Sequence, residues 1–204
     1  MRELESLRRH YGGHIPGLLG ARHSYAVLCP LVERPEGLHL LYEVRSAALH
    51  RQPGEVCFPG GRMEAGETAE DCALRETWEE LAIPPSAVHV LGRLDFIAHR
   101  ANFLMQPVLA RVDGAALDAM CPSPAEVEET FLVPLAHLLD HPPLEYEYRL
   151  VPETRGFPNE LVGIPEDYRW QAGKENVPVY PWGKHAIWGL TGRITRNLVK
   201  LLSE

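Results

Sequence analysis

Three glutamates near the middle of the sequence form its densest group of side chains with chemical potential. Glu76 precedes Glu79 and Glu80 by three and four residues, so on a helix all three carboxylates share one face. Carboxylates this close repel one another and raise each other's pKa unless a cation lies among them. Oxygen ligands of this kind suit Mg²⁺ or Mn²⁺, which commonly bridge to substrate phosphates. The cluster therefore predicts a divalent-metal site for a phosphorylated ligand.

The residues around the glutamates distinguish a metal site from an ordinary solvated acidic face. The segment Pro59-Gly60-Gly61 precedes the helix, and glycine lets a backbone approach a ligand closely and present a carbonyl oxygen to a metal. The apolar residues of the helix occupy other positions, namely Ala69, Ala73, Leu74, Trp78 and Leu81. The acidic face is therefore free for chemistry.

The segment 61–83 resembles the Nudix box, Gly-x5-Glu-x7-Arg-Glu-U-x-Glu-Glu-x-Gly-U, in which U is a bulky aliphatic residue. Thr77 and Ala82 depart from this pattern, at an aliphatic position and at the usual glycine, and neither change removes a metal ligand. Because alanine is disfavoured in a left-handed helix cap, Ala82 could alter how the helix ends. The matching residues are Gly61, Glu67, Arg75, Glu76, Glu79, Glu80 and Ile83.

The resemblance implies an α+β fold, an α/β/α sandwich around a mixed β-sheet, in which the box forms a loop-helix-loop metal site. Two or more Mg²⁺ ions, or Mn²⁺, would bridge a diphosphate and activate a water molecule there. The implied metal ligands are the carbonyl of Gly61 and the carboxylates of Glu76, Glu79 and Glu80.

The resemblance also assigns supporting and catalytic roles. Glu67 and Arg75 would pair and brace the loop against the helix. The general base is left open between a box glutamate, Glu79 or Glu80, and a carboxylate from a later loop, for which Glu126 is our candidate.

A second resemblance, to the extended signature of coenzyme A pyrophosphatases, narrows the substrate. That signature reads Leu-Leu-Thr-x-Arg-Ser-x3-Arg-x3-Gly-x3-Phe-Pro-Gly-Gly, and this chain departs from it at Tyr42, Glu43 and His50. The resemblance implies hydrolysis of coenzyme A or acyl-coenzyme A to 3′,5′-ADP and (acyl-)4′-phosphopantetheine. The residues that match in register are Arg45, Ser46, Gly54, Phe58, Pro59, Gly60 and Gly61.

Three cationic residues are the candidates for substrate binding. The planar guanidinium of Arg45 could hold a phosphate oxygen through two hydrogen bonds, the alternative being a surface salt bridge. His50 and Arg51 could contact the adenosine 3′-phosphate that distinguishes coenzyme A from ordinary nucleotides.

Two other functions remain open from the sequence. A Nudix hydrolase of ADP-sugars or other nucleoside diphosphate derivatives would have the same box. A Nudix module that senses a nucleotide without hydrolysing it is disfavoured, because such modules typically lose box carboxylates that this chain keeps.

Composition and charge argue against several classes of protein. The 204 residues, 45% of them hydrophobic and 24% charged, suit one globular domain over 1–204. A formal charge of −8 argues against a nucleic-acid partner. The longest apolar run, 25–32, is too short to span a membrane, and the scattered cysteines favour a reduced, cytoplasmic protein. Whether the chain forms a homodimer is left open.

Hydrophobic periodicity places the site residues on a coarse set of elements. The best-defined helix, 68–81, has an N-terminal capping signal at Thr68 and Asp71. Segments 25–32 and 38–44 flank a turn and predict a hairpin, whereas 142–181 has no clear period. Further helices are expected at about 2–11 and 185–202, and further strands at 54–58, 88–97, 104–112 and 129–133.

Overall fold

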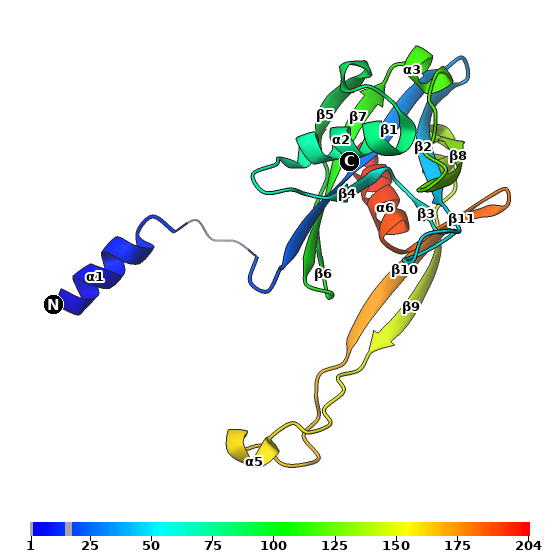
Figure 1. Ribbon diagram of the computed structural model, residues 1–204. Coiled ribbons are helices and arrows are strands. Elements are labelled where there is room, and N and C mark those ends of the chain that lie inside the picture. The colour runs from blue at the N-terminus through cyan, green and yellow to red at the C-terminus, as the bar shows by residue number, and fades with distance from the viewer. Residues whose placement is uncertain (1, 15–17) are drawn as a thin grey trace.

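The computed structural model describes residues 2–14 and 18–204, and its helices and strands are labelled in Figure 1. An eight-stranded sheet forms its centre, and a long hairpin extends away from it. The elements are α1 (Arg2–Tyr11), β1 (His23–Arg34), β2 (Gly37–Arg45), β3 (Val56–Cys57), β4 (Gly60–Arg62), α2 (Ala69–Leu81), η1 (Pro85–Ala87), β5 (Val88–Arg93), β6 (Ile97–His99), β7 (Phe103–Val112), α3 (Gly114–Asp118), β8 (Val127–Pro134), α4 (Leu135–Asp140), β9 (Leu144–Leu150), α5 (Asn159–Val162), β10 (Gly173–Trp182), β11 (His185–Ile187) and α6 (Gly189–Ser203).

The sheet is mixed, and β1 lies at its centre. β1 pairs in parallel with β7 and antiparallel with β2, its partner in the expected hairpin. The turn of that hairpin joins Arg34 to Gly37, whose φ of +118° favours glycine. β8, which comes much later in the chain, pairs with the other edge of β2.

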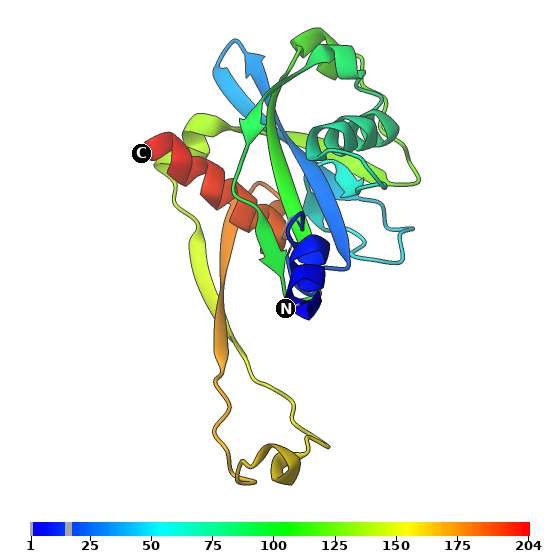
Figure 2. The ribbon, with the colours of Figure 1, turned by 90° about the vertical axis from the view of Figure 1, so that its left-hand side faces the viewer.

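Helices cover both faces of the sheet, which confirms the predicted α+β sandwich. Successive residues of a strand point to opposite faces, so Ala26 and Leu28 of β1 pack on the side of α2. Val27 and Cys29 pack on the opposite side, with Ile194 and other apolar residues of α6. The two helices lie on opposite sides of the sheet in Figure 2.

The helix α2 begins as its sequence suggests, and Ala82 does not alter how it ends. Thr68 is the N-cap, and its Oγ1 accepts a hydrogen bond from the Asp71 backbone N–H at 3.1 Å. Ala82 adopts the left-handed conformation, with φ 56° and ψ 27°, and its N–H bonds the Trp78 carbonyl. The helix therefore ends in the left-handed cap even though the usual glycine is absent.

The C-terminal helix begins at Gly189, so the expected start at His185 is wrong. Residues His185–Ile187 form β11 instead, because they pair with β10 in the register Tyr180↔Ile187. Among the described residues, no helix is long and apolar enough to cross a membrane.

The segment without clear periodicity forms a hairpin arm. β9 and β10 pair antiparallel from Leu144↔Val179 to Leu150↔Gly173, and residues 151–172 form the tip. Figures 1 and 2 both show this arm reaching away from the sheet. Glu175 ties the arm to the rest of the chain, since its carboxylate accepts hydrogen bonds from Tyr148 within the arm and from Arg100 and Arg193 outside it.

The sheet opens where the Nudix-like segment enters it. β1 pairs with β2 through residues 31–34, but through residues 25–27 it pairs with the short strand β4. β4 contains Gly60 and Gly61 and leads into the loop before α2. This arrangement brings the carboxylates of α2 next to the opening between β1 and β2.

Candidate active site

A cavity of about 440 Å³ lies at this opening and gathers residues from distant parts of the chain. Its acidic lining residues are Glu55, Glu76, Glu80 and Glu126, and its basic ones are Arg45, Arg51 and Arg62. Its largest apolar lining residues are Tyr25, Phe58, Phe103, Met105, Trp188, Leu190 and Ile194. Carboxylates, guanidinium groups and aromatic rings thus surround one space.

Glu80 is the most deeply placed of the box carboxylates, with 3% of its surface exposed. Its Oε2 accepts a hydrogen bond from the Gly60 backbone N–H at 2.8 Å. Burial, followed by the negative charge of Glu43, raises the pKa of Glu80 to about 9. Without a cation, this carboxyl is therefore protonated near neutral pH.

Glu76 packs against the backbone of Gly61. A Cβ at position 61 would lie 2.3 Å from the Glu76 carboxyl carbon, so a larger residue there would displace that carboxylate from its present position. Gly60 is needed for a separate reason, because its φ is +154° and a Cβ there would lie 2.3 Å from the Ala26 carbonyl oxygen. Burial raises the pKa of Glu76 as well, against the opposing effect of Arg75.

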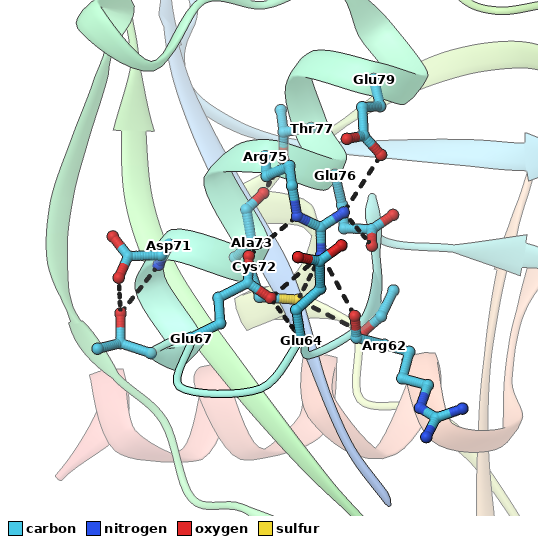
Figure 3. A network of polar contacts seen from close by, with 12 residues as sticks. Arg62, Glu64, Glu67, Asp71, Cys72, Ala73, Arg75, Glu76, Thr77 and Glu79 are labelled. Atoms are coloured by element: carbon cyan, nitrogen blue, oxygen red, sulfur yellow. Dashed lines mark hydrogen bonds and ion pairs between the residues drawn. The ribbon is translucent and has the colours of Figure 1, made fainter.

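Arg75 holds the box together, as Figure 3 shows. Its Nε donates to Glu67 Oε1 at 2.9 Å, and this pair braces the loop in the expected way. Its Nη1 donates to Glu76 at 2.7 Å and to Glu79 at 3.2 Å. The guanidinium group holds the pKa of Glu67 below its usual range.

The predicted metal ligands are only partly brought together. Glu76 and Glu80 line the cavity, whereas Glu79 is exposed and its carboxylate turns toward Arg75. The carbonyl oxygen of Gly61 lies 3.6 Å from the thiol of Cys72. Within residues 2–14 and 18–204, no three acidic, histidine or cysteine side chains already converge as a metal site.

The chemistry of these groups nevertheless fits a divalent cation. The pKa values of Glu76 and Glu80 are both raised, and neighbouring carboxylates contribute to each shift. A bound cation would relieve that repulsion and favour the ionised forms. A donor set made of oxygen atoms suits Mg²⁺ or Mn²⁺.

The expected substrate-binding residues divide into two groups. Arg45 and Arg51 line the cavity, and the Nε of Arg45 donates to the Arg51 carbonyl at 3.4 Å. His50, which was expected beside Arg51, is exposed and is not among the residues that line the cavity. Sequence adjacency to Arg51 therefore does not place His50 at the ligand space.

Arg62 is a cavity residue that sequence reasoning missed. It pairs with Tyr25, which in turn pairs with Met105, so the three lie side by side across β4, β1 and β7. Figure 3 shows the side chain of Arg62 pointing away from the Arg75 network. Arg45, Arg51 and Arg62 have no ion-pair partner in the described part of the chain.

Glu126, the later-loop carboxylate, reaches the cavity as expected. It is exposed, and its backbone carbonyl accepts a hydrogen bond from the Ser46 N–H at 2.8 Å. The Ser46 hydroxyl also donates to the Pro124 carbonyl at 3.2 Å. Ser46 therefore ties the Arg45 loop to the loop that carries Glu126.

Glu43 is a buried carboxylate that contacts the cavity residue Cys57, and the sequence did not predict a role for it at the site. It stands where the coenzyme A signature has threonine, and 1% of its surface is exposed. Its Oε1 accepts a hydrogen bond from the Cys57 thiol at 3.2 Å, while its buried Oε2 has no partner among the described residues. Burial raises the pKa of Glu43 to about 7.

Comparisons with known proteins identify the family. A family model described as the NUDIX domain matches residues 22–153. The mitochondrial coenzyme A diphosphatase NUDT8 of Mus musculus is 36% identical over 180 residues, which cover 87% of this chain and 77% of that protein. An uncharacterized Nudix hydrolase, NudL, of Yersinia enterocolitica is 34% identical over 91% of this chain and 85% of its own length.

A solved structure supports the fold. The Nudix hydrolase RenU of M. smegmatis superimposes with a TM-score of 0.50 at 23% identity, covering 59% of this chain and 75% of that one. The sandwich and its box therefore define a Nudix domain. This chain belongs to the Nudix hydrolase family, which confirms the resemblance seen in its sequence.

Proposed function

We propose that this chain is a Mg²⁺-dependent diphosphatase that cleaves coenzyme A or acyl-coenzyme A to 3′,5′-ADP and (acyl-)4′-phosphopantetheine. Relatives named as coenzyme A diphosphatases support the proposal. Four matched residues of the extended signature, Arg45, Phe58, Gly60 and Gly61, line the cavity, which supports the proposal further.

The observation that carries the proposal is the set of arginines without ion-pair partners beside the buried carboxylates. Coenzyme A has a diphosphate and a separate 3′-phosphate, and guanidinium groups bind phosphate oxygens through paired hydrogen bonds. Arg45, Arg51 and Arg62 line the same 440 Å³ cavity as Glu76 and Glu80. The cavity thus offers cationic groups for phosphates next to oxygen ligands for a metal.

Each residue then has a defined task. Glu76, Glu79, Glu80 and the Gly61 carbonyl would hold Mg²⁺, which when bound neutralises the diphosphate and lowers the pKa of a water molecule. Arg45 would hold a diphosphate oxygen. Glu126 lines the cavity with an exposed carboxylate that no described residue engages in an ion pair, and so it is available to accept a proton from the attacking water.

A second candidate is the hydrolysis of ADP-sugars or other nucleoside diphosphate derivatives. The box carboxylates and Arg45 would serve these substrates equally well. Arg51 favours coenzyme A, because ADP-sugars carry no 3′-phosphate for an additional cation to bind.

Product analysis tests the proposal. The purified chain is incubated with Mg²⁺ and either coenzyme A or ADP-ribose, and the products are resolved by mass spectrometry, with Glu80→Gln as the matched inactive control. We expect 3′,5′-ADP and 4′-phosphopantetheine in equal amounts. Intact coenzyme A alongside cleaved ADP-ribose would replace this proposal with the second candidate.

A further inference from the structure

Trp188 is a partly exposed aromatic residue that lines the cavity. The residue is 45% exposed, although tryptophan is highly buried on average, and it lines the same space as Arg51 and Glu80. Within the described chain its ring packs against no other aromatic ring, whereas Trp170 and Trp182 each contact one or more rings. The indole is therefore available to a flat ligand.

The backbone that carries Trp188 is held in place from several sides. The residue after it, Gly189, has a φ of +61°, which favours glycine. The Trp188 carbonyl accepts a hydrogen bond from the Gly192 N–H at 3.0 Å, and a Cβ on Gly192 would lie 2.5 Å from the Pro178 carbonyl oxygen. The start of α6 therefore packs closely on β10, and the backbone that carries the indole is held in place beside the cavity.

A side-chain contact also links this turn of α6 to the loop that carries Arg51. The hydroxyl of Thr191, which is buried, donates to the Val56 carbonyl at 3.0 Å. Val56 begins β3, directly after the loop 46–55. Trp188 and Arg51 thus come from two segments that are joined beside the cavity they share.

We infer that Trp188 is the stacking platform for the adenine ring of the substrate, an inference that rests on the proposed function. Adenine offers a flat π-face that stacks on an aromatic side chain, whereas the pantetheine half is a flexible aliphatic amide without such a face. The ribose that carries the 3′-phosphate is bonded to the adenine. Trp188 and Arg51 therefore bind neighbouring groups of one nucleotide, and Trp188 determines specificity for the base.

Binding of the two separate products tests the inference. 3′,5′-ADP contains the adenine, and 4′-phosphopantetheine lacks it, so their dissociation constants are measured by titration calorimetry with Mg²⁺ present. Trp188→Leu is expected to weaken binding of 3′,5′-ADP by about 5- to 150-fold, the range of base stacking on an aromatic side chain. Binding of 4′-phosphopantetheine should not change, and Trp188→Phe should recover most of the lost affinity for 3′,5′-ADP.

Trp170→Leu is the matched control. Trp170 is 38% exposed in the tip of the hairpin arm and does not line the cavity, so its variant should bind both products like the wild type. A fluorescence titration provides a second measurement with the variant Trp188→Phe, which keeps an aromatic ring but lacks the indole. Quenching of tryptophan fluorescence by 3′,5′-ADP should be present in the wild type and lost in this variant.

Three results would overturn the inference. The first is that Trp188→Leu weakens the binding of both products equally, and the second is that it weakens the binding of 4′-phosphopantetheine alone. The third is that 3′,5′-ADP quenches the fluorescence of Trp188→Phe as much as that of the wild type. Failure of the proposed function gives a different pattern. If the chain cleaves ADP-ribose and not coenzyme A, Trp188→Leu should still weaken the binding of an adenine nucleotide such as AMP, because ADP-ribose carries the same ring.

Discussion

Replacing Glu80 by glutamine isolates the electrostatic cost of the buried carboxylate. Glutamine has nearly the same shape, and its amide oxygen can keep the hydrogen bond from the Gly60 N–H, which is 2.8 Å long in the wild type. The substitution removes only the ionisation. It is therefore expected to leave the fold intact and to change how stability depends on pH.

The size of this effect on the free energy of unfolding follows from the pKa of Glu80, which is about 9 in the folded chain against an ordinary value of 4.5. Because the folded-state pKa is raised, wild-type stability is greatest at or below pH 4.5 and falls as the pH rises toward 9. At pH 7.5, three pH units above the ordinary pKa, the loss is at most roughly 4 kcal/mol, at about 1.4 kcal/mol per unit. Glu80→Gln does not undergo this loss.

Urea unfolding without divalent cations, at pH values from 4.5 to 9, measures the effect. The Glu80→Gln variant should equal the wild type in free energy of unfolding near pH 4.5 and exceed it increasingly at higher pH. At saturating Mg²⁺ its turnover should be at least about 100-fold lower, because charge on the metal site is lost. A stability difference that does not change with pH would refute the reasoning, as would near wild-type turnover.

Four further outcomes are expected. Mg²⁺ should raise the melting temperature of the wild type more at pH 8 than at pH 6, because binding requires ionised carboxylates, and the rise should be small in Glu80→Gln. Arg45→Ala should lower kcat/KM for every diphosphate substrate, and an unchanged rate would mean that Arg45 is only a surface residue. Arg51→Ala should reduce the preference for coenzyme A over 3′-dephospho-coenzyme A by about 10- to 150-fold, the loss of one charge-assisted contact, whereas His50→Ala should not, since His50 lies outside the cavity. Ala82→Gly should raise the free energy of unfolding by about 0.5–1 kcal/mol in urea titrations, because it relieves a left-handed alanine.

Local signals in the sequence were sufficient for the box and its helix. The capping residue Thr68, the spacing of Glu76 from Glu79 and Glu80, and the Arg75–Glu67 pair all act within a few turns of one another. The turn at Gly37 likewise determines the first hairpin from adjacent residues. Such features depend on short-range geometry, which periodicity and spacing describe well.

The features that the sequence did not predict depend on pairing between distant segments. The arm of β9 and β10 is exposed along most of β9, so its sequence lacks the alternation of a strand with one buried face. The periodicity of residues 185–187 predicts a helix, but these residues pair with β10 and form a strand. Arg62 and Trp188 join the site only because β4 pairs with β1 and α6 packs on β10, contacts that local sequence patterns do not show.

The comparison that tests the central claim most directly is the specificity constant for coenzyme A against ADP-ribose, measured on the purified chain with Mg²⁺. Arg51 lines the same cavity as the buried Glu80 and the other carboxylates, and only coenzyme A has a 3′-phosphate for that arginine. We therefore predict a kcat/KM at least about 10-fold higher for coenzyme A, the least expected from one charge-assisted contact. An equal or higher kcat/KM for ADP-ribose would contradict the assignment of coenzyme A as the substrate.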